Sequence, residues 1–215
     1  HGGYVLCKRG VGQAGPADFD AVRGVDTAEL FAFVGATQGV EWAALVKHHG
    51  GDPGVAQSKF VQRLAQQIDD RGTLDVLRHG VPDGPVTIRL AFFKPAHALT
   101  PELVARYEAN RLTVTRQLAY DPASNKTLDL CLFVNGLPVA TAELKNPLTG
   151  QSVEHAIVQY RQDRDAKNVT LGRRALVHFA VDPERVSMTT RLDGQATRFL
   201  PFNLGADGGA GNPAN

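Results

Sequence analysis

The sequence predicts an α/β fold in which a mixed central sheet is flanked by helices and the N-terminal third is mostly helical. Apolar residues recur at helical spacing up to about residue 80, and they alternate with a period of two from residue 86 onward. Further helical segments interrupt the later strands, so the expected order from residue 86 is β, α, β, β, β, α, β, β. The 215 residues fit one ordinary domain.

The helical third contains three expected helices. Asp26 followed by Glu29 is typical of a capping box, and the spacing after it predicts a helix over roughly 27–36. A short helix is expected at about 42–47. A third helix follows the glycine-rich breaker at 50–54, and its apolar stripe consists of Phe60, Val61, Leu64 and Ile68.

The alternating part begins with a strand from Val86 to Phe92, which Pro95 ends. Thr100 and Pro101 are typical of a helix start, and so is Ser152. The second of these helices carries Val153, Ala156, Ile157 and Tyr160 on its apolar face. The remaining strands are expected at about 113–120, 128–134, 138–145, 175–182 and 187–192.

Composition excludes some classes of protein. No stretch is long and apolar enough to span a bilayer, so we expect that the chain is not a membrane protein. Cys7 and Cys131 form no metal-type pair and suit a reducing cytoplasm. The positive charges of the 23 Lys and Arg nearly cancel the negative charges of the 22 Asp and Glu. Any binding of DNA must therefore come from a local surface or from partners.

The most informative segment is an expected hairpin with Asp129 on its first strand and Glu143 and Lys145 on its second. Glu143 and Lys145 share a face because side chains alternate along a strand. Asp129 joins them only if the turn is odd or one strand carries a bulge. The segment around Asn135 suits a three-residue loop with a left-handed glycine, so we expect the three side chains to converge.

Such a cluster suits phosphodiester hydrolysis with Mg²⁺. Asp129, Glu143 and the Leu144 backbone carbonyl would bind the ion, because hard cations prefer oxygen ligands. Lys145 would either position the attacking water or stabilise the developing charge, and the sequence leaves both roles open. A hairpin with ordinary cross-strand ion pairs among the same side chains is the alternative interpretation.

Other segments give weaker signals. The histidine pair His48-His49 has no further ligand at metal spacing, and His178 lies in an apolar strand as a core histidine would. No phosphate-binding Gly-x-x-x-x-Gly-Lys-Ser/Thr sequence occurs, so the chain carries no ATP motor of its own. The basic candidates for DNA contact after the hairpin are Arg161, Arg164, Lys167, Arg173 and Arg174.

These residues carry a resemblance to a known family. The chain resembles the N-terminal endonuclease domain of the R (restriction) subunit of type I restriction-modification enzymes, which belongs to the PD-(D/E)XK nuclease superfamily. Besides the hairpin, the resemblance extends over Asp26–Gln38, Gly72–Gly80, Gln159–Arg164, Val186–Arg191 and Phe199–Asn203.

The resemblance implies a restriction-endonuclease-like core and a type I site-specific deoxyribonuclease. Asp129, Glu143 and Lys145 fall on the family's metal-binding and catalytic positions. Family members cut double-stranded DNA with Mg²⁺, after ATP-driven motor domains of the same subunit have translocated the duplex. Their methyltransferase and specificity subunits are separate partners.

This resemblance sets the expected boundaries. An endonuclease-like domain would occupy 1–203, with a mainly helical part at 1–80 and a mixed sheet core at 86–203. The glycine-rich segment 204–215 is typical of a flexible linker, here toward an ATP-driven motor that the chain lacks.

One departure from the family concerns the helix after the hairpin. Many members carry Gln-x-x-x-Tyr there, whereas this chain has Ala156 four residues before Tyr160. Gln159, Tyr160, Arg161 and Arg164 are the candidate DNA contacts. A non-catalytic docking module for DNA or partner subunits, which keeps the nuclease fold, is the alternative function.

Overall fold

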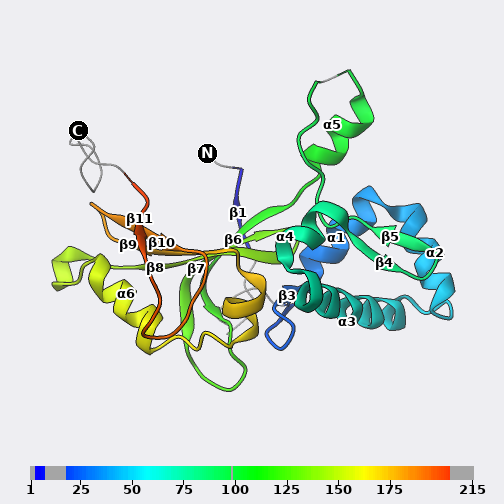
Figure 1. Cartoon of the computed structure of the whole chain (residues 1–215). Helices are drawn as coiled ribbons and strands as arrows, with labels where there is room; N and C mark the ends of the chain where they lie inside the picture. Colours follow the sequence, from blue (N-terminus) through cyan, green and yellow to red (C-terminus); the bar gives the residue numbers. More distant parts are fainter. Residues whose placement is uncertain (1–2, 8–17, 98, 204–215) are drawn as a thin grey trace.

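The computed structural model describes residues 3–7, 18–97 and 99–203. Seven strands form a mixed sheet in the order β1-β6-β7-β8-β9-β10-β11, which confirms the predicted fold class (Figure 1). The pairs β1 with β6 and β8 with β9 are parallel, and the other neighbours are antiparallel. The strands are β1 Val5–Leu6, β6 Leu112–Ala119, β7 Thr127–Val134, β8 Leu137–Leu144, β9 Val177–Val181, β10 Val186–Thr189 and β11 Leu200–Pro201.

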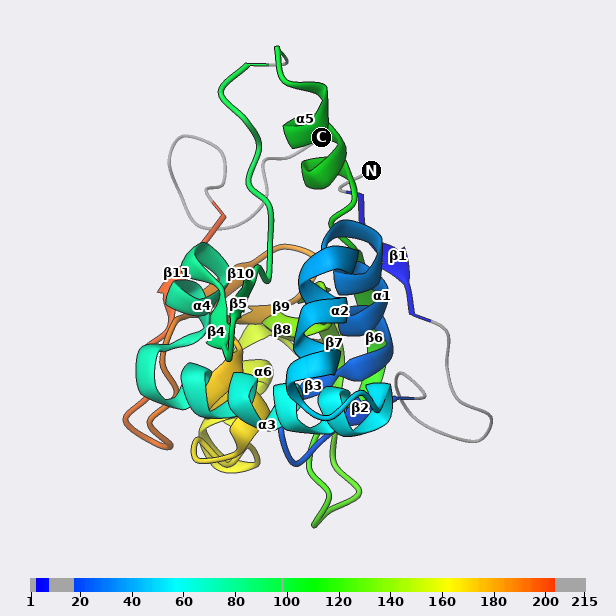
Figure 2. The same cartoon turned by 90° about the vertical axis from the view of Figure 1, so that its right-hand side faces the viewer.

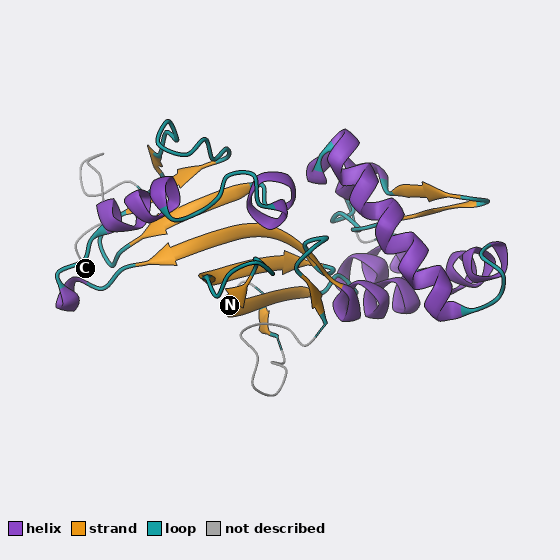
Figure 3. Ribbon diagram, turned by 90° about the horizontal axis from the view of Figure 1, so that it is seen from below, coloured by secondary structure: helices purple, strands orange, loops and turns teal. Residues whose placement is uncertain are grey.

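Four helices gather at one end of this sheet, and we call them the helical lobe (Figure 3). They are α1 Thr27–Thr37, α2 Gly39–His48, α3 Pro53–Arg71 and α4 Thr73–His79. The three predicted helices are confirmed, and Asp26 caps α1 by accepting a hydrogen bond from the Glu29 amide at 3.1 Å. The predictions missed α4, which Gly72, with φ of 83°, separates from α3.

The predicted strand from 86 to 92 was wrong in length and in place. Only β5 (Val86–Ile88) forms, and it pairs with β4 (Val81–Asp83) in a separate two-stranded sheet. The Gln38 side chain bonds to both the amide and the carbonyl of Arg89, and the Asn110 side chain does the same at Phe92. Side-chain amides therefore replace a neighbouring strand along this extended segment.

The remaining elements are short or lie at the edges. The predicted helix at Pro101 is α5 (Pro101–Glu108), which has no buried residue and stands away from the body in Figure 1. A second small sheet pairs β2 (Phe19–Asp20) with β3 (Val25–Asp26). The last elements are a 3-10 turn (Pro147–Thr149), α6 (Val153–Gln162) and a π-helical turn (Thr170–Arg174).

The turn between β7 and β8 lies against the helical lobe, which Figure 2 shows in front of the sheet. Leu137 is fully buried in the apolar core of this lobe. The Asp26 amide donates to the Gly136 carbonyl at 2.8 Å. The tip of the hairpin is thus fixed to the start of α1, while its open end extends away from the lobe.

Gly136 offers a direct test of this attachment. It has φ of 83°, and a Cβ there would lie 2.3 Å from the Asp26 carbonyl oxygen. We expect Gly136→Ala to lower the free energy of unfolding by about 2–3 kcal/mol, through left-handed strain and a backbone clash. Urea denaturation measures this. Gly150→Ala is the control, because Gly150 also has positive φ but meets nothing within 4 Å. Equal losses in both variants would contradict the role of the contact.

On the lower face of the sheet in Figure 1, α6 connects β8 to the parallel β9 and covers both strands. Its Tyr160 is fully buried with Cys131 and Phe133 of β7 in a second apolar core. Within the described part of the chain, no helix combines the length and the hydropathy that a membrane crossing requires.

Candidate active site

The register of the β7–β8 hairpin decides where Asp129 points. Val134 pairs with Leu137, so the connecting loop has two residues and the predicted three-residue loop was wrong. Asn135 and Gly136 adopt φ of 51° and 83°, as a type I′ turn requires. The register then shifts, because Phe133 pairs with Pro138 while Leu132 pairs with Ala140. Val139 is the extra residue of this bulge.

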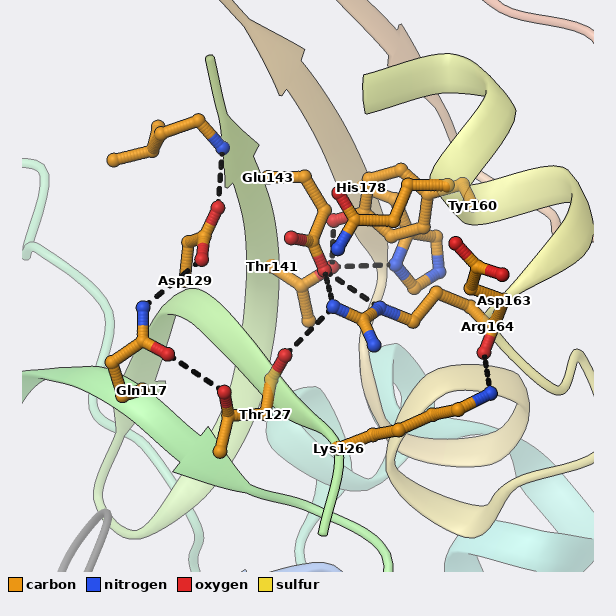
Figure 4. A network of polar contacts seen from close by, with 12 residues as sticks. Gln117, Lys126, Thr127, Asp129, Thr141, Glu143, Tyr160, Asp163, Arg164 and His178 are labelled. Carbon is orange, nitrogen blue, oxygen red and sulfur yellow. Dashed lines mark hydrogen bonds and ion pairs between the residues drawn. The ribbon is translucent and has the colours of Figure 1, made fainter. Parts of the chain in front are cut away.

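The bulge restores the parity that the short loop would have reversed. Beyond it Leu130 pairs with Ala142, so Asp129 and Glu143 come to the same face at the open end of the hairpin. The Leu144 amide donates to Asp129 Oδ2 at 2.8 Å, which fixes that carboxylate beside β8 (Figure 4).

Glu143 is a fully buried carboxylate on this face. Burial raises its pKa to about 7, the nearby Asp129 carboxylate adds to the rise, and Arg164 opposes it. Its Oε2 atom has no hydrogen-bond partner among the described residues. Buried carboxylate oxygens are normally hydrogen-bonded, so the unpartnered oxygen needs an explanation, and a bound ligand would provide one.

Arg164, which follows α6, holds the other oxygen of Glu143. Its Nε and Nη2 atoms lie 2.7 Å and 2.6 Å from Glu143 Oε1, and Nη2 also donates to the Thr127 carbonyl at 2.7 Å. The guanidinium lies over the Tyr120 ring, 5.6 Å from its centroid. Its side chain is only 5% exposed, so this is a buried ion pair.

Lys145 directly follows β8, and strand alternation puts its side chain on the same face as Glu143. Its Nζ donates to Gln159 Oε1 on α6 at 2.5 Å. Gln159 therefore contacts the lysine of the acidic cluster, and its side chain remains partly exposed.

Next to the carboxylates is a chain of buried polar groups. Thr141 Oγ1 lies 2.8 Å from the Tyr160 hydroxyl and 2.7 Å from His178 Nδ1. Burial lowers the pKa of His178 to about 4, so its ring is neutral at pH 7. The prediction that His178 is a core histidine is confirmed.

Gln117 of β6 holds the second oxygen of Asp129. Its Nε2 donates to Asp129 Oδ1 at 3.0 Å, and its Oε1 accepts from the Thr127 hydroxyl at 2.7 Å. Gln117 has φ of 54°, a conformation that a non-glycine residue rarely adopts inside a strand. The amide bridge offsets part of this strain.

The structure changes the set of candidate DNA contacts. Tyr160 is fully buried and Arg164 is buried against Glu143, so neither has a surface to offer a duplex. Arg174 is 2% exposed and pairs with Asp69, which removes it as well. Arg161 donates to the Thr197 carbonyl from a partly buried position. Gln159 and Arg161 keep part of their surface.

The donor set fits a hard divalent cation. Asp129 and Glu143 supply carboxylate oxygens. The Leu144 backbone faces Asp129, because the Leu144 N–H donates a hydrogen bond to the Asp129 carboxylate. No group of three or more His, Cys, Asp and Glu side chains suited to a metal occurs within the described ranges. Any ion here would therefore rely on two carboxylates, a carbonyl and solvent.

Sequence reasoning missed the roles of Arg164, Gln117 and Thr141. Arg164 stands 21 residues after Glu143 with an irregular segment between them, so no periodicity links the two. Charge clustering and the resemblance both drew attention to Arg164, but as a candidate for DNA contact and not as the partner of Glu143.

Comparison with known families gives the following match. Residues 77–202, more than half of the chain, match the family described as type I restriction enzyme R protein N terminus. Comparisons with curated proteins and with solved structures found no match.

Proposed function

Because this chain belongs to the family of type I restriction enzyme R protein N termini, we propose that it is a Mg²⁺-dependent endonuclease domain that cuts double-stranded DNA. The observation that carries the proposal is the pair of carboxylates at the open end of the hairpin. A buried Glu143 with an unpartnered oxygen, next to Asp129, is costly to stability unless a ligand uses it.

Each residue of the site would have a distinct role. Asp129, Glu143 and the Leu144 carbonyl would hold Mg²⁺, which would supply Lewis-acid activation of water and phosphate. Lys145, held by Gln159, either orients the attacking water or stabilises the charge that develops on the phosphate. Gln117 and Arg164 keep the two carboxylates in place.

The proposed setting is a cytoplasmic restriction complex. ATP would be consumed by motor domains of the same subunit, outside this chain, and methyltransferase and specificity subunits would recognise the DNA. The near-neutral charge of the chain supports this division, because a weak electrostatic field leaves DNA capture to partners.

A metal-induced shift of the melting temperature tests the proposal. We expect Mn²⁺ to raise the Tm of the wild-type chain and to leave that of Glu143→Gln unchanged, since a ligand that binds only the folded state stabilises it. A docking module that lacks metal affinity would show no shift in either protein, and that result would refute the nuclease function.

Gln117 provides a second prediction. We expect Gln117→Gly to weaken Mn²⁺ binding about ten-fold, because loss of a group that orients a metal ligand typically has such an effect. The free energy of unfolding of this variant should be unchanged or higher, since glycine adopts the left-handed backbone conformation freely. Calorimetric titration and urea denaturation measure the two quantities. Gln162→Ala, at an exposed position of α6, is the control. Unchanged Mn²⁺ affinity in Gln117→Gly would contradict the role.

A further inference from the structure

We propose that the acidic pair of Asp129 and Glu143 binds one divalent cation per chain and not two, because Arg164 already holds the second oxygen of Glu143. This inference rests on the proposed function and concerns the number of ions at the same site. Nucleases can use one metal ion or two, and the two ions of a two-metal site lie about 3.5–4 Å apart, so both would need oxygens from the same two carboxylates.

The two oxygens of Glu143 are not equivalent. Oε1 accepts hydrogen bonds from Nε and Nη2 of Arg164, whereas Oε2 has no partner in the described chain. Oε2 is therefore the oxygen of Glu143 that could bind a cation without the loss of an existing hydrogen bond. A second ion at Oε1 would have to displace the guanidinium.

Displacement is opposed by the way Arg164 is held. Its side chain is 5% exposed, it also bonds to the Thr127 carbonyl, and it lies over the Tyr120 ring. Three groups would lose their partner if it left, namely Glu143 of β8, Thr127 of β7 and Tyr120, which follows β6. Arg164 thus contributes a fixed positive charge where a second metal ion would otherwise bind.

The net charge of the cluster also favours a single bound ion. Asp129 and Glu143 are already balanced by Arg164 and Lys145, so one divalent cation leaves the site positive. A second cation would enter that positive field close to a fully buried carboxylate, where repulsion is weakly screened.

Counting bound Mn²⁺ tests the inference. Mn²⁺ alone is titrated into the chain, and bound ion is measured by electron paramagnetic resonance and by calorimetry, with Asp129→Asn subtracted as background. We expect one ion per wild-type chain. Two ions would overturn this inference and leave the metal-dependent nuclease standing, whereas no ion would refute the proposed function as well.

Substitutions of Arg164 test the cause. Arg164→Gln should accept a second ion, because it removes a nearby positive charge and frees Oε1. Arg164→Lys retains the charge and should still bind one ion. If a folded Arg164→Gln also binds only one, the limit does not come from Arg164 and the inference fails. Should Arg164→Gln not fold, the wild-type count decides.

Discussion

Asp129→Asn is expected to abolish DNA cleavage in the complete restriction complex, by about 10³-fold or more, and to leave ATP hydrolysis unchanged. The substitution keeps the shape of the side chain but replaces a charged ligand with a neutral amide, so the hard cation loses half of its carboxylate set. Gln117 and the Leu144 amide hold Asp129 at the chain surface rather than in the core, so the fold should survive.

Cleavage of a circular duplex in the presence of ATP measures this effect, and release of phosphate from ATP gives the parallel readout. Asp163→Asn is the matched control, because Asp163 is an exposed aspartate close to the site. Two outcomes would contradict a catalytic role for Asp129. DNA cleavage could persist in Asp129→Asn, or it could fall equally in Asp163→Asn.

Arg164→Met should lower the free energy of unfolding by about 3–5 kcal/mol, since removing one partner of a buried ion pair leaves the other charge uncompensated. Glu143 would then remain in the core with neither oxygen satisfied. Burial already raises the pKa of Glu143 to about 7, so loss of Arg164 should raise it further and part of the penalty should be relieved by protonation.

Urea denaturation compares Arg164→Met with Arg185→Met. Arg185 pairs with Glu154 at 2.7 Å, but both side chains are largely exposed, so that variant should lose less than about 1 kcal/mol. The double variant Arg164→Met/Glu143→Gln should recover part of the lost stability, because it removes the unpaired charge. Similar losses in the two arginine variants would contradict the importance of the buried pair.

The hairpin shows how far local patterns reach. Alternation located β7 and β8 to within about one residue, and two-residue spacing placed Glu143 and Lys145 on one face. The loop length was predicted wrongly, because Asn-Gly suits both a two-residue turn and a longer loop. The bulge at Val139 then decided the face of Asp129, and it forms where Pro138 interrupts the ladder and the hairpin tip meets α1.

The segment after Ile88 shows the opposite limit. Its apolar alternation is genuine, yet its hydrogen-bond partners are the side chains of Gln38 and Asn110, which are 51 and 18 residues away along the chain. Periodicity indicates which side of a segment is buried, but it does not indicate which groups form hydrogen bonds with its backbone.

The sequence by itself determined the kind of chemistry that the chain can support, because residue types at short separation set the available ligands and the face of a strand on which they lie. It also determined most helices and strands, since these depend on local periodicity and caps. Only the tertiary structure decided that Asp129 meets Glu143, that Arg164 takes one oxygen of Glu143, and that Tyr160 is buried. These features depend on a register shift and on contacts between distant segments, whose energies no local pattern records.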